Sequence, residues 1–171
     1  MAGDAELHCT FHGIGVSAGT AVGPLVVVTP PPKAPADEAP TTDAAAASAT
    51  VHQVLDDVAK GLDARAASAA EHAKPILEAG AMMARDPGLA MGIDTQLQKG
   101  LGVTTAVTAA VEEYCAMFES LGGYMAERVT DLRDVRDRAV ARLLGQPEPG
   151  VPSLTVPSIL AAHDLAPAET A

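Results

Sequence analysis

Residues 124–145 read YMAERVTDLRDVRDRAVARLLG, and the pattern of this stretch predicts the helix against which the rest of the chain packs. Its apolar residues recur at intervals of three or four positions, which places them on one face of a helix. They are Met125, Val129, Leu132, Val135, Ala139 and Leu143. Gly145 ends the helix, and Pro147 and Pro149 prevent its continuation. Because a helix with one apolar face gains most of its stability from packing, the stretch predicts one long helix and further helices that cover this face.

The polar side of the same stretch carries opposite charges at helical spacing. Arg133 stands four residues before Asp137, and Asp134 stands four before Arg138. Residues at this spacing face each other on a helix, and each such pair contributes about 0.2–0.5 kcal/mol. We therefore expect two ion pairs within this helix.

The composition favours a helical protein whose partner is another protein. Hydrophobic residues make up 48% of the 171 positions but aromatic residues only 2%, so the apolar surface is mostly Ala, Val, Leu and Met. Alanine has the highest helix propensity, and the length suffices for one ordinary domain or two small ones. The formal net charge of −11 argues against nucleic acid as a partner and favours a basic protein surface.

Cysteine usage and hydropathy indicate a cytoplasmic protein. Cys9 and Cys115 lie far apart in sequence, which is typical of reduced thiols rather than of a disulfide framework. No apolar run approaches the roughly 20 residues that a membrane helix needs, so we expect no membrane association. The N-terminus, MAGDAELHCT, is acidic where a signal peptide would be basic.

Three further helical segments precede the opening stretch. Thr41 or Thr42 is a candidate cap for a first helix that continues to about position 70. Pro75 suits the first turn of a second helix, which the Asp-Pro-Gly sequence at 86–88 breaks before a shorter continuation at 89–99.

The third helix is expected to start at Thr104 or Thr105 and to end at Leu121, before two glycines. Together these segments predict a mainly α fold, an antiparallel bundle of four main helices in which the second is kinked.

Extended segments flank the helices. Residues 7–28 read as two extended segments joined by a glycine-rich turn, and residues 156–162 read as a strand followed by a helix start near Asp164. We infer a bundle inserted into an incomplete α/β domain. The expected division is the first strands at 1–30, a proline-rich linker at 31–40, the helical subdomain at 41–146, and a truncated return strand and helix start at 147–171.

No stretch predicts a catalytic or metal site. HGIGVSAG at 12–19 is interpreted as a structural turn, because a phosphate-binding loop would need a helix directly after it. His8 and His12 alternate with Cys9 along a strand, so they face away from it, and a zinc site is not expected.

The remaining histidines stand without a neighbouring nucleophile; they are His52, His72 and His163. Four methionines on the helices allow two interpretations that stay open here, core filling and an adaptable docking surface. They are Met82, Met83, Met91 and Met117.

Four stretches, in order, resemble the N-terminal region of Enzyme I, the phosphoenolpyruvate-protein phosphotransferase of the bacterial sugar phosphotransferase system. GIGVSAGTAVGP is similar to the family's GxxxSxGxAxG stretch, and ILEAGAMMARDPGL to its second helix and the break that follows. ERVTDLRDVRDRAVARLLG resembles the helix ERxxDxRDxxxRxxxxLLG, and ILAAHDLAPAETA resembles a strand followed by DLTPxET.

This resemblance implies a phosphohistidine α/β domain interrupted by a helical subdomain that docks the carrier protein HPr. The implied reaction is phosphorylation of an active-site histidine by phosphoenolpyruvate with Mg²⁺, followed by transfer to a histidine of HPr. The histidine would follow residue 171, and the phosphoenolpyruvate and metal site would belong to a further domain, so this chain alone is expected to be inactive and to contain no cofactor. A monomer is expected for the fragment and a homodimer for the full enzyme.

Carried over position by position, the resemblance implies a set of HPr-facing residues on three helices. They are Glu71, Gly80, Met83 and Asp86, then Ala109, Glu112, Glu113 and Met117, and finally Arg128 and Arg133. Carboxylates at the rim of an apolar surface would attract a basic partner. Arg133 has the alternative role of pairing with Asp137 within its own helix.

Three positions depart from the family pattern. Gly80 replaces the usual histidine, the acidic run after the second helix is reduced to Arg-Asp-Pro-Gly at 85–88, and Ala166 stands where the DLTP threonine would lie near the active-site histidine. Two alternatives therefore remain, a non-enzymatic helical adaptor and a related phosphoenolpyruvate-using multi-domain phosphotransferase.

Overall fold

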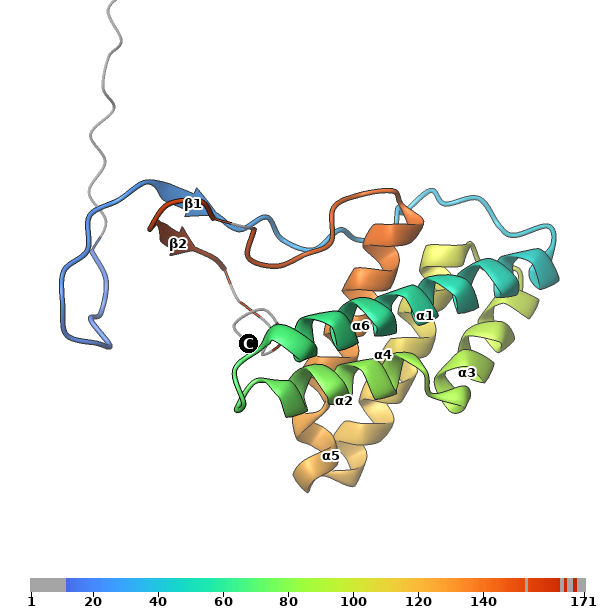
Figure 1. Cartoon of the computed structure of the whole chain (residues 1–171). Coiled ribbons are helices and arrows are strands. Elements are labelled where there is room, and N and C mark those ends of the chain that lie inside the picture. Colours follow the sequence, from blue (N-terminus) through green and yellow to red (C-terminus); the bar gives the residue numbers. More distant parts are fainter. Residues whose placement is uncertain (1–11, 153, 164, 166–167, 169–171) are drawn as a thin grey trace, which may run out of the picture.

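The chain folds mainly into helices, as the sequence predicts (Figure 1). The computed structural model describes residues 12–152, 154–163, 165 and 168. Their elements are β1 (Leu25–Val27), α1 (Ala44–Ser68), α2 (Lys74–Ala84), α3 (Pro87–Gln98), α4 (Val103–Leu121), α5 (Gly123–Glu127), α6 (Val129–Leu143) and β2 (Ile159–Ala161). The helices form a bundle, and the two short strands lie to one side of it (Figure 1).

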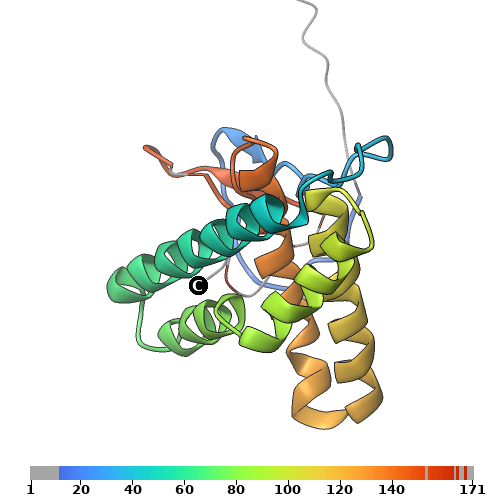
Figure 2. The ribbon, with the colours of Figure 1, turned by 90° about the vertical axis from the view of Figure 1, so that its right-hand side faces the viewer.

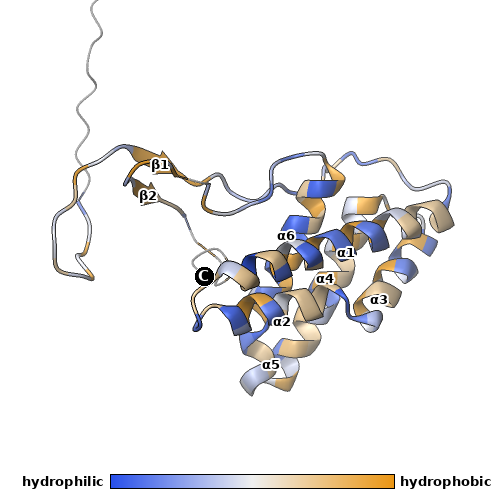
Figure 3. Cartoon of the chain, viewed as in Figure 1, coloured by the Kyte–Doolittle hydropathy of each residue, from blue (hydrophilic) through white to orange (hydrophobic). Residues whose placement is uncertain are grey.

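The predicted apolar face of residues 124–145 is the face that packs into the bundle. Val129, Leu132, Val135 and Ala139 are buried, and Met125 and Leu143 are half-buried. α6 packs against α1, α2 and α4, and α4 also packs against α3. α2 and α4 carry more apolar colouring than α6, which is largely hydrophilic (Figure 3). The amphipathic pattern of α6 therefore fixes its orientation in the core.

The prediction of one continuous helix over residues 124–145 is wrong. Arg128 separates α5 from α6, and its backbone N–H donates to the carbonyl of Met125 at 3.1 Å, three residues back. Regular α-helical bonding resumes where Leu132 N–H donates to the Arg128 carbonyl at 3.0 Å. The apolar residues keep their spacing of three or four positions across this turn, from Met125 through Val129 to Leu132. The periodicity of the apolar residues therefore could not reveal it.

Three of the predicted helix starts need correction, and the start of α2 is confirmed. Asp43, rather than a threonine, caps α1, because its carboxylate accepts from the N–H of Ala46 at 3.0 Å. Pro75 lies in the first turn of α2, as predicted. Asp86 marks the predicted break, but α3 begins at Pro87 rather than at position 89, because the Asp86 carboxylate caps it by accepting from the N–H of Leu89 at 2.9 Å.

The start of α4 is capped from a distant part of the chain. α4 begins at Val103, and Glu38 of the proline-rich segment accepts from the N–H groups of Thr104 and Thr105 at 2.9 and 2.8 Å. The hydroxyl of Thr105 also donates to Glu38 at 2.7 Å. Burial acts to raise the pKa of Glu38, but the hydrogen bonds from Thr104 and Thr105 outweigh it and lower this pKa. Thr104 and Thr105 thus lie inside the helix rather than at its predicted start, and a carboxylate 66 residues upstream of Thr104 caps it.

Removing the Glu38 cap is expected to destabilise the chain in a pH-dependent way. Glu38→Ala is expected to lower the free energy of unfolding by about 0.5–2 kcal/mol at neutral pH, the usual cost of losing a helix cap. Because its pKa is lowered in the folded chain, the contribution of Glu38 is present above its ordinary value of 4.5 and is lost as the pH falls through the folded value. Urea unfolding of the wild type and of Glu38→Ala, at neutral pH and at about pH 3, measures the difference in their free energies of unfolding. An equal difference at both pH values would contradict the cap.

Gly102 provides the control for this cap. A Cβ at Gly102 would lie 2.4 Å from the carboxyl carbon of Glu38, so Gly102→Ala has to displace the carboxylate. The loss in Gly102→Ala and the loss in Glu38→Ala are therefore expected not to add in the double variant.

The bundle is inserted in the chain between two parallel strands, β1 and β2. β1 pairs in parallel with β2, with Leu25 opposite Ile159 and Val27 opposite Ala161. The chain leaves the sheet after β1, forms all six helices and returns at β2, so the helices are inserted between two neighbouring parallel strands. This agrees with a bundle inserted into an α/β unit. The exact domain bounds remain a prediction.

The sheet is smaller than the sequence predicts. Residues 12–23 form no strand, and apolar side chains there, such as Ile14 and Val16, are exposed. A strand needs a neighbour that satisfies its hydrogen bonds, and among the described residues this segment has none. The strand expected at 156–162 is limited to β2. Residues 7–11 and most of the helix expected from Asp164 lie outside the described residues. No helix in the described part of the chain has both the length and the apolar character to cross a membrane.

Candidate docking groove

An apolar groove of about 420 Å³ lies among α2, the start of α3, α4, α5 and the first turn of α6. The α4, α5 and α6 segment extends beyond α2 at the lower end of the molecule (Figure 2). The residues that line this apolar groove are Ala79, Met82, Met83, Asp86, Leu89, Tyr114, Phe118, Tyr124, Met125, Arg128 and Leu132. Most of this lining is apolar, and Asp86 and Arg128 supply one charge of each sign.

The apolar groove collects side chains that are rare in this sequence. The chain has two tyrosines, two phenylalanines and no tryptophan, and both tyrosines and Phe118 line the groove. Three of its six methionines also line the groove. Aromatic residues and methionine are enriched in the cores of protein interfaces, and methionine adapts its shape to a partner. The groove thus has the composition of a protein-docking surface.

Two glycines admit Tyr114 to the groove. A Cβ at Gly88 would lie 2.5 Å from the Tyr114 hydroxyl oxygen, and a Cβ at Gly92 would lie 3.3 Å from its ring. These glycines are four residues apart on α3 and so form one notch in its surface. The Tyr114 and Phe118 rings lie with their centroids 6.4 Å apart. Burial and the nearby Asp86 carboxylate both raise the pKa of Tyr114, so its hydroxyl is neutral and donates or accepts at neutral pH.

Filling this notch is expected to move Tyr114. Gly88→Ala places a methyl group far inside contact distance of the hydroxyl, whereas Gly92→Ala makes only a tight contact with the ring. The NMR ring resonances of Tyr114 are therefore expected to shift more in Gly88→Ala than in Gly92→Ala. Equal spectra for the two variants would contradict the notch.

Arg128 is held in a fixed orientation at the groove. Its guanidinium lies 4.4 Å from the centroid of the Tyr124 ring and also donates to the Tyr124 hydroxyl. Its Nη1 donates to the buried Asp131 carboxylate at 3.0 Å. A cation over an aromatic face and beside a carboxylate has little freedom left. The side chain therefore presents a pre-ordered polar group next to the apolar lining.

Residues 12–128 match the family described as PEP-utilising enzyme, N-terminal. The chain belongs to this family. It is 42% identical over 170 residues to a phosphoenolpyruvate-protein phosphotransferase of Streptomyces coelicolor and 32% identical over 173 residues to one of Haloferax volcanii. These alignments cover 96% and 95% of the chain but 30% of each relative, so the chain spans less than a third of their length.

Solved structures confirm the resemblance to the N-terminal region of Enzyme I. The NMR solution structure of the Enzyme I protein nEIt matches 88% of this chain and 63% of its own, with a TM-score of 0.69 and 25% identity. The N-terminal domain of Enzyme 1 – Nitrogen matches the same shares, with a TM-score of 0.65 and 22% identity, and shows a shared fold.

In this PEP-utilising N-terminal domain, the residues that the family resemblance implies for docking divide into two groups. Met83, Asp86 and Arg128 line the apolar groove. Met117 is 45% exposed on α4, the helix that also carries Tyr114 and Phe118. Met83, Asp86 and Arg128 are thus brought together at one end of the bundle, whereas Met117 lies outside the groove lining.

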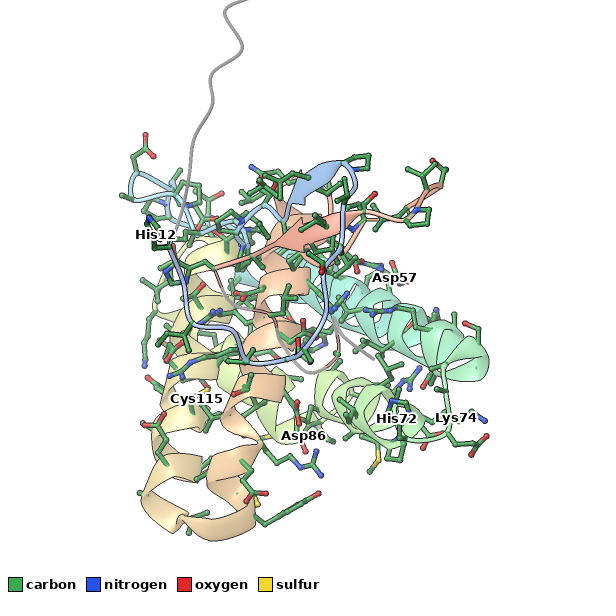
Figure 4. All side chains as sticks on the ribbon, turned by 90° about the vertical axis from the view of Figure 1, so that its left-hand side faces the viewer. His12, Asp57, His72, Lys74, Asp86 and Cys115 are labelled. Carbon is green, nitrogen blue, oxygen red and sulfur yellow. The ribbon has the colours of Figure 1, made fainter. Side chains whose placement is uncertain are left out.

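Three further positions that the resemblance implies lie elsewhere, just before α2, within α2 and on α4. Gly80 is buried against α1, where a Cβ would lie 3.2 Å from Leu62, so it offers no exposed surface. Glu71 is exposed just before α2, with its carboxylate 2.5 Å from Lys74 Nζ. Lys74 and Asp86 lie at opposite ends of α2 (Figure 4). Ala109 is half-buried on α4.

The remaining charged positions take part in contacts between helices. Arg133 Nη2 lies 3.1 Å from Glu112 and 3.6 Å from Glu119 on α4. The predicted pair of Arg133 with Asp137 is therefore wrong, because the carboxylates of the adjacent helix lie closer, and Asp137 pairs with Arg136 instead. The hydrogen bond from Arg133 is the main reason that the pKa of Glu112 is lowered.

Two other predicted charge positions are also paired within the bundle. Glu113 accepts from the side-chain amide of Gln96 at 2.7 Å. The pair of Asp134 with Arg138 is confirmed, with the Arg138 Nε donating at 2.8 Å.

The described residues contain no group of three or more His, Cys, Asp or Glu side chains that could hold a metal ion. His12 and His72 lie on opposite sides of the view in Figure 4. His52 Nε2 lies 3.2 Å from Asp94, and Cys115 is buried within α4, where burial raises the pKa of its thiol. His8, Cys9 and Ala166 lie outside the described residues.

The sequence interpretation missed most of the groove. Tyr114, Tyr124 and Met82 lie on its surface, and of these the sequence indicates only Met82 as a candidate docking residue. A usable signal was present, because a bulky aromatic side chain is conspicuous in a chain with 2% aromatic residues. Their convergence from α4 and α5 depends on the tertiary fold.

Proposed function

We propose that this chain is the carrier-docking part of a phosphoenolpyruvate-protein phosphotransferase, and that the apolar groove binds HPr. The observation that carries the proposal is the gathering at the groove of both tyrosines and half of the methionines, Met83 among them, with Asp86 and Arg128. Met83, Asp86 and Arg128 are positions that the family resemblance implies for HPr. The composition of the groove and the family resemblance therefore support the same surface as the HPr-binding site.

Charge supports a basic partner for this groove. The chain carries 22 acidic and 11 basic residues, which favours association with a basic surface and raises the rate of encounter. Asp86 provides a carboxylate at the groove itself, and one of its oxygens is already occupied in capping α3. The apolar lining would supply affinity, and the carboxylates orientation.

The phosphoryl chemistry is proposed for the longer enzyme rather than for this chain. The curated relatives are about three times as long, and we propose that a histidine phosphorylated by phosphoenolpyruvate with Mg²⁺ belongs to the additional length. In such an enzyme the docked carrier would present its own histidine for transfer. We expect no incorporation of phosphate from phosphoenolpyruvate into this chain alone. A monomer is proposed for the chain, a homodimer for the longer enzyme, and a cytoplasmic location for both.

Titration calorimetry of the chain with a bacterial HPr tests the docking proposal. We expect saturable binding of one carrier per chain, with an affinity that weakens as the salt concentration rises. The absence of saturable binding at low salt and high micromolar carrier concentration would contradict the proposal. A non-enzymatic adaptor for a different protein would then be the better interpretation.

A further inference from the structure

We propose that the apolar groove is a peroxide-sensitive site, where oxidation of methionine to methionine sulfoxide weakens docking. The inference rests on the proposed function and adds a means of regulating it. The side chains concerned are Met82, Met83 and Met125, all of which line the groove.

Met82 is the most accessible of these thioethers. Its residue is 74% exposed on α2, while Met83 and Met125 are half-buried. Met91, which is 69% exposed on α3, lies outside the groove lining. The chain thus contains two methionines of similar exposure, one at the proposed docking surface and one away from it.

The described part of the chain offers few competing targets for an oxidant. The sequence has no tryptophan. Cys115 is fully buried, and burial raises the pKa of its thiol, so little of the reactive thiolate is present. The exposed thioethers are therefore the accessible sulfur atoms among the described residues.

The reaction is a two-electron oxygen transfer from a hydroperoxide or hydrogen peroxide. A sulfur lone pair attacks the terminal peroxide oxygen, an S–O bond forms, and the O–O bond breaks. The leaving oxygen takes a proton and departs as water or an alcohol, so the peroxide is reduced by two electrons and the sulfur is oxidised by two. Sulfoxide reductases reverse this lesion, which gives the site the properties of a switch.

The product changes what the groove can bind. A sulfoxide oxygen is a strong acceptor, and the groove around it is lined by Phe118, Leu89 and Leu132. Docking would transfer this oxygen from water to a mainly apolar lining, and the loss of its hydrogen bonds to water is expected to weaken binding by about tenfold or more. Favourable contacts between a thioether and the neighbouring aromatic rings are also lost.

The experiment compares the affinity of the chain for HPr before and after hydrogen peroxide. The peroxide is removed before the carrier is added, and peptide mass spectrometry locates each added oxygen. We expect Met82 and Met91 to be oxidised first, Cys115 to stay reduced, and the affinity to fall about tenfold. Treatment with a methionine sulfoxide reductase should restore it.

Leucine variants separate the groove from the rest of the chain, because leucine has a similar volume and cannot be oxidised. Each variant is compared with itself before and after peroxide. Met82→Leu, and the triple variant that also carries Met83→Leu and Met125→Leu, are expected to keep their affinity, whereas Met91→Leu should lose affinity as the wild type does.

Three outcomes would overturn the inference. The first is unchanged affinity of wild-type chain that carries sulfoxide at Met82, and the second is an equal loss in the triple leucine variant. The third is oxidation of Met82 that lags far behind that of Met91. Failure of the unoxidised chain to bind is a separate result, which overturns the proposed function and the regulation of docking with it.

Discussion

Replacing Arg138 with methionine is expected to lower the free energy of unfolding by about 3–5 kcal/mol. The Arg138 and Asp134 side chains are only 3% and 4% exposed, and their Nε–Oδ2 distance is 2.8 Å. Burial acts to lower the pKa of Arg138, but the hydrogen bonds and charges of Asp134 and Glu148 together outweigh it and raise this pKa. Without Arg138 the carboxylate of Asp134 remains buried and unpaired. Urea unfolding monitored by circular dichroism measures the loss.

Two control experiments separate the effect of burial from the loss of an ion pair. In the double variant Asp134→Leu with Arg138→Met, no charge of the pair remains buried, so most of the stability is expected to return. Asp56 and Lys60 form a pair at the same helical spacing on the exposed surface of α1. Lys60→Met is expected to leave unfolding nearly unchanged, since exposed pairs contribute little. Equal effects of Arg138→Met and Lys60→Met would contradict the role of burial.

Replacing Met82 with lysine is expected to weaken HPr binding by at least about tenfold, which corresponds to 1.4 kcal/mol. The change removes an apolar contact from the groove and introduces a positive charge that repels a basic partner. Met82 is largely exposed, so the fold should tolerate the substitution. Titration calorimetry gives the affinity, and thermal unfolding verifies the fold.

Met91→Lys is the matched control, because Met91 has nearly the same exposure and lies outside the groove lining. We expect its affinity to stay within about twofold of the wild type. If both lysine variants weaken binding equally, the effect arises from overall charge and the groove is not the docking site.

The sequence predicted features that depend on residues close together in one helix. The buried face of α6 follows from periodicity, and the Asp134–Arg138 pair follows from a spacing of four residues. The pairing of Arg133 with Glu112 joins residues 21 positions apart on two helices, and no spacing rule predicts it. Glu38 illustrates the same limit, because its role depends on where a proline-rich segment passes over the start of α4.

Only part of the groove lining could be predicted from the sequence, because its residues come from several helices. The family resemblance implied Met83, Asp86 and Arg128, which the fold brings to one surface. Tyr114 reaches this surface through the notch at Gly88, and such an arrangement depends on how α3 packs against α4. Residues that act together across helices become visible only when the helices are placed.

A methyl NMR titration shows directly whether HPr binds in the apolar groove. The methionine methyl groups of the chain are isotope-labelled, and unlabelled HPr is added up to high micromolar concentration. We expect the resonances of Met82, Met83 and Met125, which line the groove, to shift or broaden while that of Met91 stays in place. Unchanged groove resonances, or shifts confined to Met91, would contradict docking in the groove.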